Sequence, residues 1–153
     1  MRRLGIVPCS KEKIWDLQPV AGAVPASRAY RSRFHQLAVA YVRSLTSDWL
    51  ILSAKYGLLA PNQLIPGPYD ISFTRPQDPT VSMSLLRQQA AAFARFGQVI
   101  CVCPRLYGEK IEQAFAGYCP VVHPLRGVGG WGSMHSWLQR QLNEKSSSNS
   151  KFS

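Results

Sequence analysis

The chain has no long hydrophobic run. None of its apolar segments approaches the ~18 residues that a membrane-spanning helix needs, and the apolar stretch behind the first three residues is too short for a secretory signal. Both absences argue against a membrane-spanning or secreted protein. We therefore expect a cytoplasmic protein with no membrane partner, and the sequence indicates no particular oligomeric state.

Acidic residues are also scarce. Asp and Glu number 8 against 18 Lys and Arg, which gives a formal net charge of +10. Such an excess points to an anionic partner, either a nucleic acid, with DNA favoured over RNA, or a nucleotide. The basic residues are scattered along the chain, so a charge that serves only solubility stays open as the alternative.

The cysteines follow no disulfide or metal-binding pattern. The spacings of the four form neither a secreted disulfide framework nor a paired Cys-x-x-Cys zinc site. Cys101 and Cys103 lie two residues apart on an expected strand and would face the same side, where core packing is favoured over metal binding. We therefore expect reduced thiols and no metal.

The glycine-rich turn from His123 to Gly130 lacks two nucleotide-binding signatures. It has no Gly-Lys-Ser/Thr ending, which a Walker loop requires, and it does not follow the first strand with dinucleotide-binding spacing. ATP hydrolysis and NAD binding are therefore disfavoured, and we expect no cofactor.

The chain does contain enough apolar residues for one globular domain. Its 153 residues are 46% apolar, so a sizeable core can be buried. We predict a single α/β domain over residues 1–143. The last segment, 144–153, is rich in Ser and lacks apolar periodicity, which predicts a disordered tail.

Short apolar runs alternate with helical patterns along this domain. Strands are predicted at 4–7, 49–52, 99–102 and 121–122. Amphipathic helices are predicted from a Ser27 cap to Leu45, from Thr80, Ser82 or Ser84 to Gly97, over 107–117 and over 134–142. This alternation predicts a three-layer α/β/α fold with a four-stranded, mainly parallel sheet.

Polar segments follow the predicted strands at the sheet edge where ligands of such folds bind. The most unusual one lies in the stretch from Trp49 to Asp70, where an apolar strand gives way to a long loop that we expect to be irregular. Four segments are expected to converge on one polar site: Cys9–Lys11, Ser53–Gly57, Cys103–Arg105 and His123–Gly127.

Several of these residues are candidates for binding a substrate. Lys11 and Lys55 at neighbouring strand ends, with the backbone N–H of Gly57, would form a phosphate pocket, although solvated lysines are the usual alternative. Ser10 and Ser53 lie beside these lysines in the sequence and are included in the candidate site. A further pair, Tyr56 and Tyr69, could stack on a base, with loop packing as the alternative.

Four other residues are candidates for catalysis. Cys9 would become a nucleophile if a nearby cation lowered its pKa, whereas a small buried Cys at a strand end is commonplace. Asp16 and Asp70 could orient a water molecule or accept a proton. His123 could donate to a developing negative charge. Each acid and the histidine have a purely structural role as the alternative.

Two segments resemble known families. Leu52–Pro61, followed by Leu64, Ile65 and Tyr69, resembles the YaaA family of peroxide-stress, DNA-binding proteins. Pro8–Lys11 is similar to the Pro-Cys-Ser plus Lys signature of the archaeosine synthase core domain, which acts on a modified base in tRNA. Along residues 4–142 the chain looks closest to small uncharacterised bacterial and phage domains of the same loose group.

The expected architecture also resembles the uracil-DNA glycosylase superfamily, because His123-Pro124-Leu125 precedes the closing helix. In that superfamily the first loop supplies the water-activating residue, and the late His-containing loop stabilises the leaving base. Here only His123 and Pro124 match well, since Pro8–Lys11 lacks the Asp or Asn followed by Pro.

These resemblances imply a nucleic-acid-binding, base-directed enzyme that cleaves an N-glycosidic bond, a DNA glycosylase-like hydrolase of DNA repair or base modification. In this hypothesis Lys11, Lys55 and Arg126 bind phosphate or leaving-group charge. Two alternatives stay open. One is a non-enzymatic DNA-binding stress-response protein of the YaaA type, and the other is a nucleoside-monophosphate N-glycosidase.

Overall fold

The computed structural model describes residues 2–151, with side chains described as far as residue 146. A five-stranded sheet forms its centre, in the order β4-β3-β1-β6-β7. The four parallel strands are β1 (Arg3–Pro8), β3 (Asp48–Ser53), β6 (Gln98–Cys101) and β7 (Val121–Val122). These are the four predicted strands, confirmed to within one residue at each end. The mixed α/β class is therefore confirmed, although the sheet has five strands in place of four.

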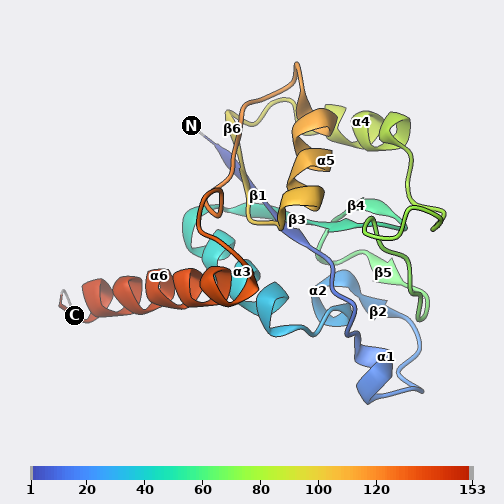
Figure 1. Ribbon diagram of the computed structural model, residues 1–153, viewed down its shortest axis with the longest axis horizontal. Coiled ribbons are helices and arrows are strands. Elements are labelled where there is room, and N and C mark those ends of the chain that lie inside the picture. The colour runs from blue at the N-terminus through green and yellow to red at the C-terminus, as the bar shows by residue number, and fades with distance from the viewer. Residues whose placement is uncertain (1, 152–153) are drawn as a thin grey trace.

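Helices cover both faces of the sheet (Figure 1). α3 (Arg33–Leu45) and α6 (Trp131–Lys151) pack on one face, and α4 (Met83–Ala91) and α5 (Arg105–Phe115) on the other. Side chains of β1 alternate between the two cores, because Leu4 and Ile6 face α4 and α5 while Val7 faces α3 and α6. A Cβ atom at Gly5 would lie 2.7 Å from Cβ of Val42, so only glycine lets α3 approach the sheet this closely.

A small lobe lies beyond the carboxyl ends of β1 and β3 (Figure 1). Its elements are α1 (Ile14–Leu17), β2 (Val24–Pro25), α2 (Ala26–Ala29) and β5 (Leu64–Ile65). β2 and β5 form an antiparallel pair, and backbone N–H groups of Ala26 and Ser27 donate to carbonyls of the loop that carries β5. The lobe thus ties the segment after β1 to the segment after β3.

The predicted irregular loop after β3 begins with a strand. Gly57, with φ of +81°, allows the chain to reverse after β3, and β4 (Gly57–Leu59) pairs antiparallel with it. The side chain of Gln89 on α4 then accepts from the N–H of Leu58 and donates to the carbonyl of Tyr56. The expectation that no strand follows β3 was therefore wrong, because a single left-handed glycine suffices for the hairpin.

Helix boundaries differ from the prediction at two places. The helix expected from a Ser27 cap is broken at Tyr30, which lies in an isolated bridge with Lys13, and α3 begins after Ser32, whose hydroxyl accepts from the N–H of His35. α6 continues to Lys151, into the segment 144–153 for which a disordered tail is predicted, and that disorder stays a prediction. No glycine or proline follows Gly132 to stop that helix. Residues 152–153 lie outside the described residues.

In the described chain, no helix is long and apolar enough to cross a membrane.

The predicted cap of α4 is confirmed for one of its three candidates, because the hydroxyl of Ser82 accepts from the N–H of Leu85.

Candidate functional site

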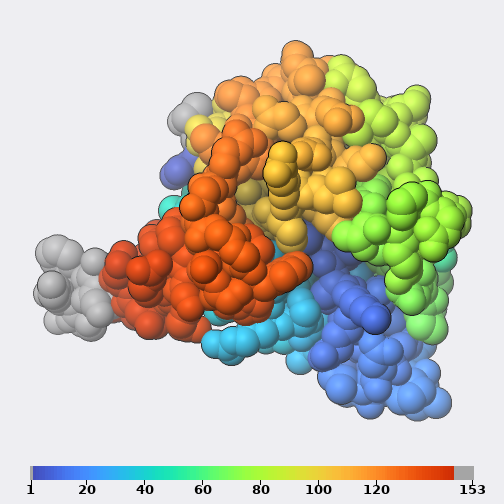
Figure 2. Space-filling model, viewed as in Figure 1, coloured from blue at the N-terminus to red at the C-terminus, as the bar shows by residue number. Residues whose placement is uncertain are grey.

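A cleft of about 1000 Å³ opens beyond the carboxyl ends of β1 and β6. Six segments line it and meet on the face that Figure 2 shows. They are the turn after β1, α1, the start of α3, the loop after β5, the start of α5 and the start of α6. The lining residues are Pro8, Cys9, Ser10, Lys11, Glu12, Asp16, Ser32, Arg33, Phe34, Asp70, Ile71, Ser72, Thr74, Arg75, Pro104, Leu106, Tyr107, Trp131 and His135.

Cys9 is the first residue after β1. Its backbone N–H donates to the carbonyl of Leu52, which continues the ladder to β3, and its thiol donates to the Tyr107 hydroxyl over 3.8 Å. Burial raises the pKa of the Cys9 thiol and outweighs its hydrogen bonds and the nearby charge of Lys13. Cys9 is therefore a neutral hydrogen-bonding group at neutral pH, and a cation alone does not activate it.

Lys13 is a residue that sequence reasoning missed. It is only 5% exposed, and its Nζ donates to the carbonyl of Lys11 over 3.3 Å and lies 4.5 Å from the centre of the Tyr69 ring. Burial lowers the pKa of Lys13, against the opposing effects of Cys9, Asp70 and Asp16. The one available signal was its position directly before Ile14 and Trp15, an apolar pair that draws the turn into the core.

Three hydroxyl groups form a chain behind the turn after β1. The Ser53 oxygen accepts from the N–H groups of Lys55 and Tyr56, both over 3.1 Å, and the Ser53 hydroxyl lies 2.8 Å from that of Tyr69. Tyr69 in turn hydrogen bonds to Tyr30. Because both lone pairs of the Ser53 oxygen already accept, its proton goes to Tyr69 and the proton of Tyr69 goes to Tyr30.

The ring of Tyr69 contacts two aromatic side chains and two lysine ammonium groups. Tyr30 and Tyr56 contact it edge-on, and the ammonium groups of Lys13 and Lys55 lie 4.5 and 5.4 Å from its centre. Burial raises its pKa, and likewise that of Tyr30. The structure thus brings Ser53, Lys55 and Tyr56 beside the turn after β1, as expected, but next to the cleft and not in its lining, with Ser53 buried and Lys55 exposed.

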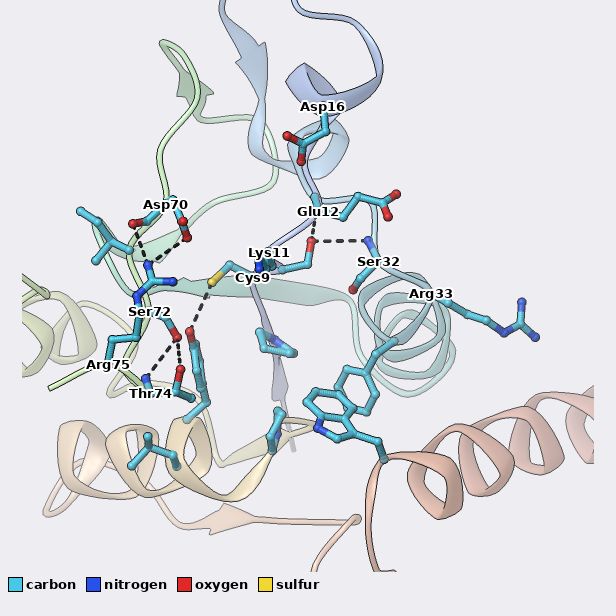
Figure 3. Close-up of a pocket in the computed structure, with 18 of the residues that line it drawn as sticks. Cys9, Lys11, Glu12, Asp16, Ser32, Arg33, Asp70, Ser72, Thr74 and Arg75 are labelled. Atoms are coloured by element: carbon cyan, nitrogen blue, oxygen red, sulfur yellow. Dashed lines mark hydrogen bonds and ion pairs between the residues drawn. The ribbon is translucent and has the colours of Figure 1, made fainter. Parts of the chain in front are cut away.

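Asp70, Ser72, Thr74 and Arg75 form one end of the cleft, here called the carboxylate end (Figure 3). Arg75 donates to the Asp70 carboxylate over 2.9 Å and to that of Asp78 over 2.7 Å. The hydrogen bond from Arg75 lowers the pKa of Asp70, which is exposed. Asp70 is therefore an ionised carboxylate that is held in place and remains accessible from the cleft.

Phe34, Trp131 and His135 form the aromatic end of the cleft. The centre of the Phe34 ring lies 5.0 Å from that of Trp131 and 5.5 Å from that of His135, and both contacts are edge-on. Figure 3 draws the preceding residue, Arg33, on the far side of Cys9 and Lys11 from the carboxylate end. This end was not predictable from the sequence, because Trp131, Met134 and Leu138 share one apolar stripe of α6. Only the structure shows that Trp131 extends beyond the core.

Among the other predicted residues at the turn, Lys11 is exposed and lines the cleft. Ser10 holds the turn, since its hydroxyl donates to the carbonyl of Glu12 over 2.6 Å and accepts from the N–H of Arg31. Asp16 lines the cleft, but its carboxylate accepts from the N–H of Lys13 over 2.8 Å and so caps α1. Gly57 belongs to the β3–β4 hairpin.

His123 and Arg126 do not line the cleft. His123 Nε2 lies 2.5 Å from the Glu112 carboxylate, and the ring lies beside Cys101 and against Gly108 of α5. Contact with Cys101, followed by Glu112, raises the pKa of His123. The physical reason is strand order, because β7 is two positions from β1, about 10 Å away across the sheet, and His123 after β7 packs against Gly108 of α5.

Within residues 2–151 no group of three or more His, Cys, Asp or Glu side chains is arranged to hold a metal ion.

Comparison with known proteins places this chain among uncharacterised relatives. The model of a family of unknown function, DUF6884, matches residues 4–140. Over 147 residues the chain is 35% identical to the uncharacterized protein YfjM of Bacillus subtilis (strain 168), a match that covers 95% of this chain and 98% of that protein. The expectation of a small uncharacterised domain is therefore confirmed.

Proposed function

The chain belongs to the DUF6884 family of unknown function, and we propose that its cleft receives one nucleotide of a nucleic acid and that the chain cleaves the N-glycosidic bond of that nucleotide. The observation that carries this proposal is the composition of the cleft. An aromatic end that suits stacking of a base and a carboxylate end that suits orientation of a water molecule flank Cys9 and Lys11 within a cleft of about 1000 Å³.

The charge of the cleft favours a polymer as the substrate. Three cations line it, Lys11, Arg33 and Arg75, and they are matched by three carboxylates, Glu12, Asp16 and Asp70. The net charge of +10 therefore resides on the rest of the chain, where it can contact neighbouring phosphates of a strand. The base and sugar of one nucleotide then enter a locally neutral cleft.

Asp70 is the residue that we assign to the attacking water. Cleavage of an N-glycosidic bond moves positive charge onto the sugar, and the departing base takes the bonding electron pair. Asp70 accepts a proton from water as the water oxygen bonds to the sugar carbon. Asp70 is ionised at neutral pH, and the hydrogen bond from Arg75 lowers its pKa further, so the carboxylate also stabilises the positive charge on the sugar.

The departing base needs a positive charge and hydrogen-bond donors. The ammonium group of Lys11 supplies the charge, the role that the sequence hypothesis gave to Lys11 together with Lys55 and Arg126, beside His123 as the residue that stabilises the base. Tyr107 supplies a donor, since its hydroxyl accepts from the Cys9 thiol and can donate in turn, and burial raises the pKa of Tyr107 to about 12. Cys9 thus acts as a hydrogen-bonding group in this proposal, and no covalent intermediate forms on it.

The test is a base-release assay. Purified protein is incubated with single- and double-stranded oligonucleotides that carry uracil, hypoxanthine and other altered bases, and abasic sites are scored after alkaline cleavage. We expect abasic sites with at least one base of the panel. Tight, salt-sensitive binding without any abasic site would instead support a non-enzymatic DNA-binding protein, as the YaaA-like segment Leu52–Pro61 implies, and would overturn the glycosidic proposal.

The volume of the cleft also favours a second candidate, a nucleoside-monophosphate N-glycosidase. About 1000 Å³ is enough for a complete mononucleotide, including its phosphate. Release of free base from nucleoside 5′-monophosphates, at a rate that oligonucleotides do not match, would favour this candidate over the polymer.

A further inference from the structure

We propose that the exposed indole of Trp131 is the surface on which the target nucleobase stacks, an inference that rests on the nucleotide-binding function proposed above. Trp131 is 57% exposed although it lines a concave cleft. A large aromatic side chain left open to water inside a cleft is the usual form of a base-stacking surface in proteins that bind single nucleotides of a strand.

The indole is held in place before any ligand arrives. Phe34, which is only 4% exposed, contacts it edge-on with an angle of 86° between the two ring planes. His135, one helical turn along α6, lies 2.7 Å through its Nδ1 from the backbone carbonyl of Trp131. Because a carbonyl can only accept, Nδ1 carries a hydrogen. Packing on one side and exposure on the other leave one aromatic surface open to the cleft.

The chemistry of the site favours a planar nucleobase over a cation as the group that contacts the indole of Trp131. A cation would also be attracted to the face of a tryptophan, but the net charge of +10 repels cations from this chain. In its neutral state His135 can accept a hydrogen bond at Nε2, which suits the N–H groups on the edge of a nucleobase. The expected stacking residues Tyr56 and Tyr69 are already packed against each other and against lysines.

The position of Trp131 orients the nucleotide in the cleft. With the base stacked on Trp131 and its edge directed to Lys11 and Tyr107, the sugar lies on the side of the base that faces Asp70. Water held by Asp70 then attacks from the side opposite the leaving base, which is the geometry that displacement at the sugar carbon requires.

The experiment is a titration of tryptophan fluorescence with the four nucleoside 5′-monophosphates and with a single-stranded deoxyoligonucleotide. Stacking of a base on Trp131 should quench part of the emission. Trp131→Phe should abolish most of this quenching while Kd, measured by calorimetry, changes less than about threefold. Trp131→Ala should raise Kd about tenfold, the effect of losing one base–aromatic stack.

Trp49→Phe is the matched control, because Trp49 lies at the start of β3, at the other end of the strands. It should keep both the quenching and the Kd of the wild-type protein, and circular dichroism checks that each variant folds. Unchanged quenching in Trp131→Phe, unchanged affinity in Trp131→Ala, or no binding of any probe would each overturn the inference.

The base-release assay separates this inference from the proposed function. Stacking on Trp131 without release of any base would refute the glycosidic reaction alone. Base release that is unaffected in Trp131→Ala would refute the stacking role alone.

Discussion

At the carboxyl ends of the strands, a cysteine thiol lies near a basic side chain at two places. The pKa shifts favour neutral groups at the first place and charged groups at the second. Cys9 pairs with Lys13 after β1, where burial dominates, so the thiol pKa is raised and the amine pKa is lowered. Cys101 lies beside His123, where hydrogen bonds dominate. Contact with Cys103, followed by His123, lowers the pKa of Cys101 to about 7, and contact with Cys101 raises that of His123.

The difference teaches that residue type alone does not identify a site. The Cys101 and His123 pair has the more activated thiol, yet Cys101 is 1% exposed and α5 covers the pair. The Cys9 and Lys13 pair is closer to neutral, yet Cys9 borders an open cleft with an ionised Asp70. On this difference in access we propose the β1 end as the functional site and a structural role for the β7 end.

Asp70→Asn should have the largest effect on base release. A smaller effect would contradict the assignment of the functional site to the β1 end. The amide cannot accept the proton of the attacking water, so single-turnover base release should fall at least ~100-fold. Asp48→Asn is the matched control, because Asp48 forms a similar ion pair with Arg2 over 2.9 Å at the far end of the strands. Equal activity of the two variants would remove Asp70 from the mechanism.

His123→Ala should change stability and leave base release within about twofold of the wild-type rate. Removal of the ring takes away one of the two partners of the buried Cys101 and leaves a hole beside Gly108, which we expect to lower the free energy of unfolding in urea by about 1–3 kcal/mol. Loss of activity without loss of stability would contradict the structural role of the β7 end.

The sequence predicted some parts of the fold and of the site and not others, according to whether the information was local in the chain. The parallel strands were predictable, because continuous apolar runs such as Leu4–Val7 and Val99–Val102 are typical of strands buried on both faces. Strand order was not predictable, so His123 was expected at the site although β7 lies two strands from β1. Cys9, Lys11 and Asp70 were predicted as site residues because they lie in polar segments that follow predicted strands. All three line the cleft.

The missed residues, Lys13 and Trp131, were missed for opposite physical reasons. Lys13 is a charged residue that the fold buries, with its Nζ over the Tyr69 ring, and no local pattern predicts such a tertiary contact. Trp131 is an apolar residue on the core stripe of α6 that the fold leaves exposed. In both cases tertiary packing decided the environment against the usual preference of the residue.

Arg75→Gln should shift the pH profile of base release. Asp70 acts as a carboxylate, so activity falls as pH drops through its pKa, which Arg75 lowers from the usual value near 3.8. Removal of Arg75 should therefore move the acid limb of kcat/KM to higher pH. Arg105→Gln, which removes a similar exposed pair with Glu109, should leave the limb in place. An unmoved limb in Arg75→Gln would show that Asp70 does not titrate in the reaction.

Lys13→Met should have the smallest effect, seen only in alkaline unfolding. The folded state holds the Lys13 proton less tightly than the unfolded state, whose pKa is near 10.5. Between the lowered pKa and 10.5 the unfolded state binds more protons, so the Lys13 contribution to the free energy of unfolding rises with pH. The difference between wild type and Lys13→Met should therefore shift in favour of the wild type across this window. A pH-independent difference would contradict the burial of the charge.

The most direct test of the central claim, that the ligand binds beyond β1 and β6, is thiol labelling with and without a bound oligonucleotide. Cys9 lines the cleft, whereas Cys119 precedes β7 at the other end of the strands, and both are half-buried thiols whose pKa burial raises. Alkylation at mildly alkaline pH is followed by mass spectrometry of each cysteine peptide. We predict that a saturating single-stranded oligonucleotide slows labelling of Cys9 severalfold and leaves Cys119 unchanged. Equal rates at Cys9 with and without the oligonucleotide, or protection of Cys119 instead, would contradict the assignment of the cleft as the site.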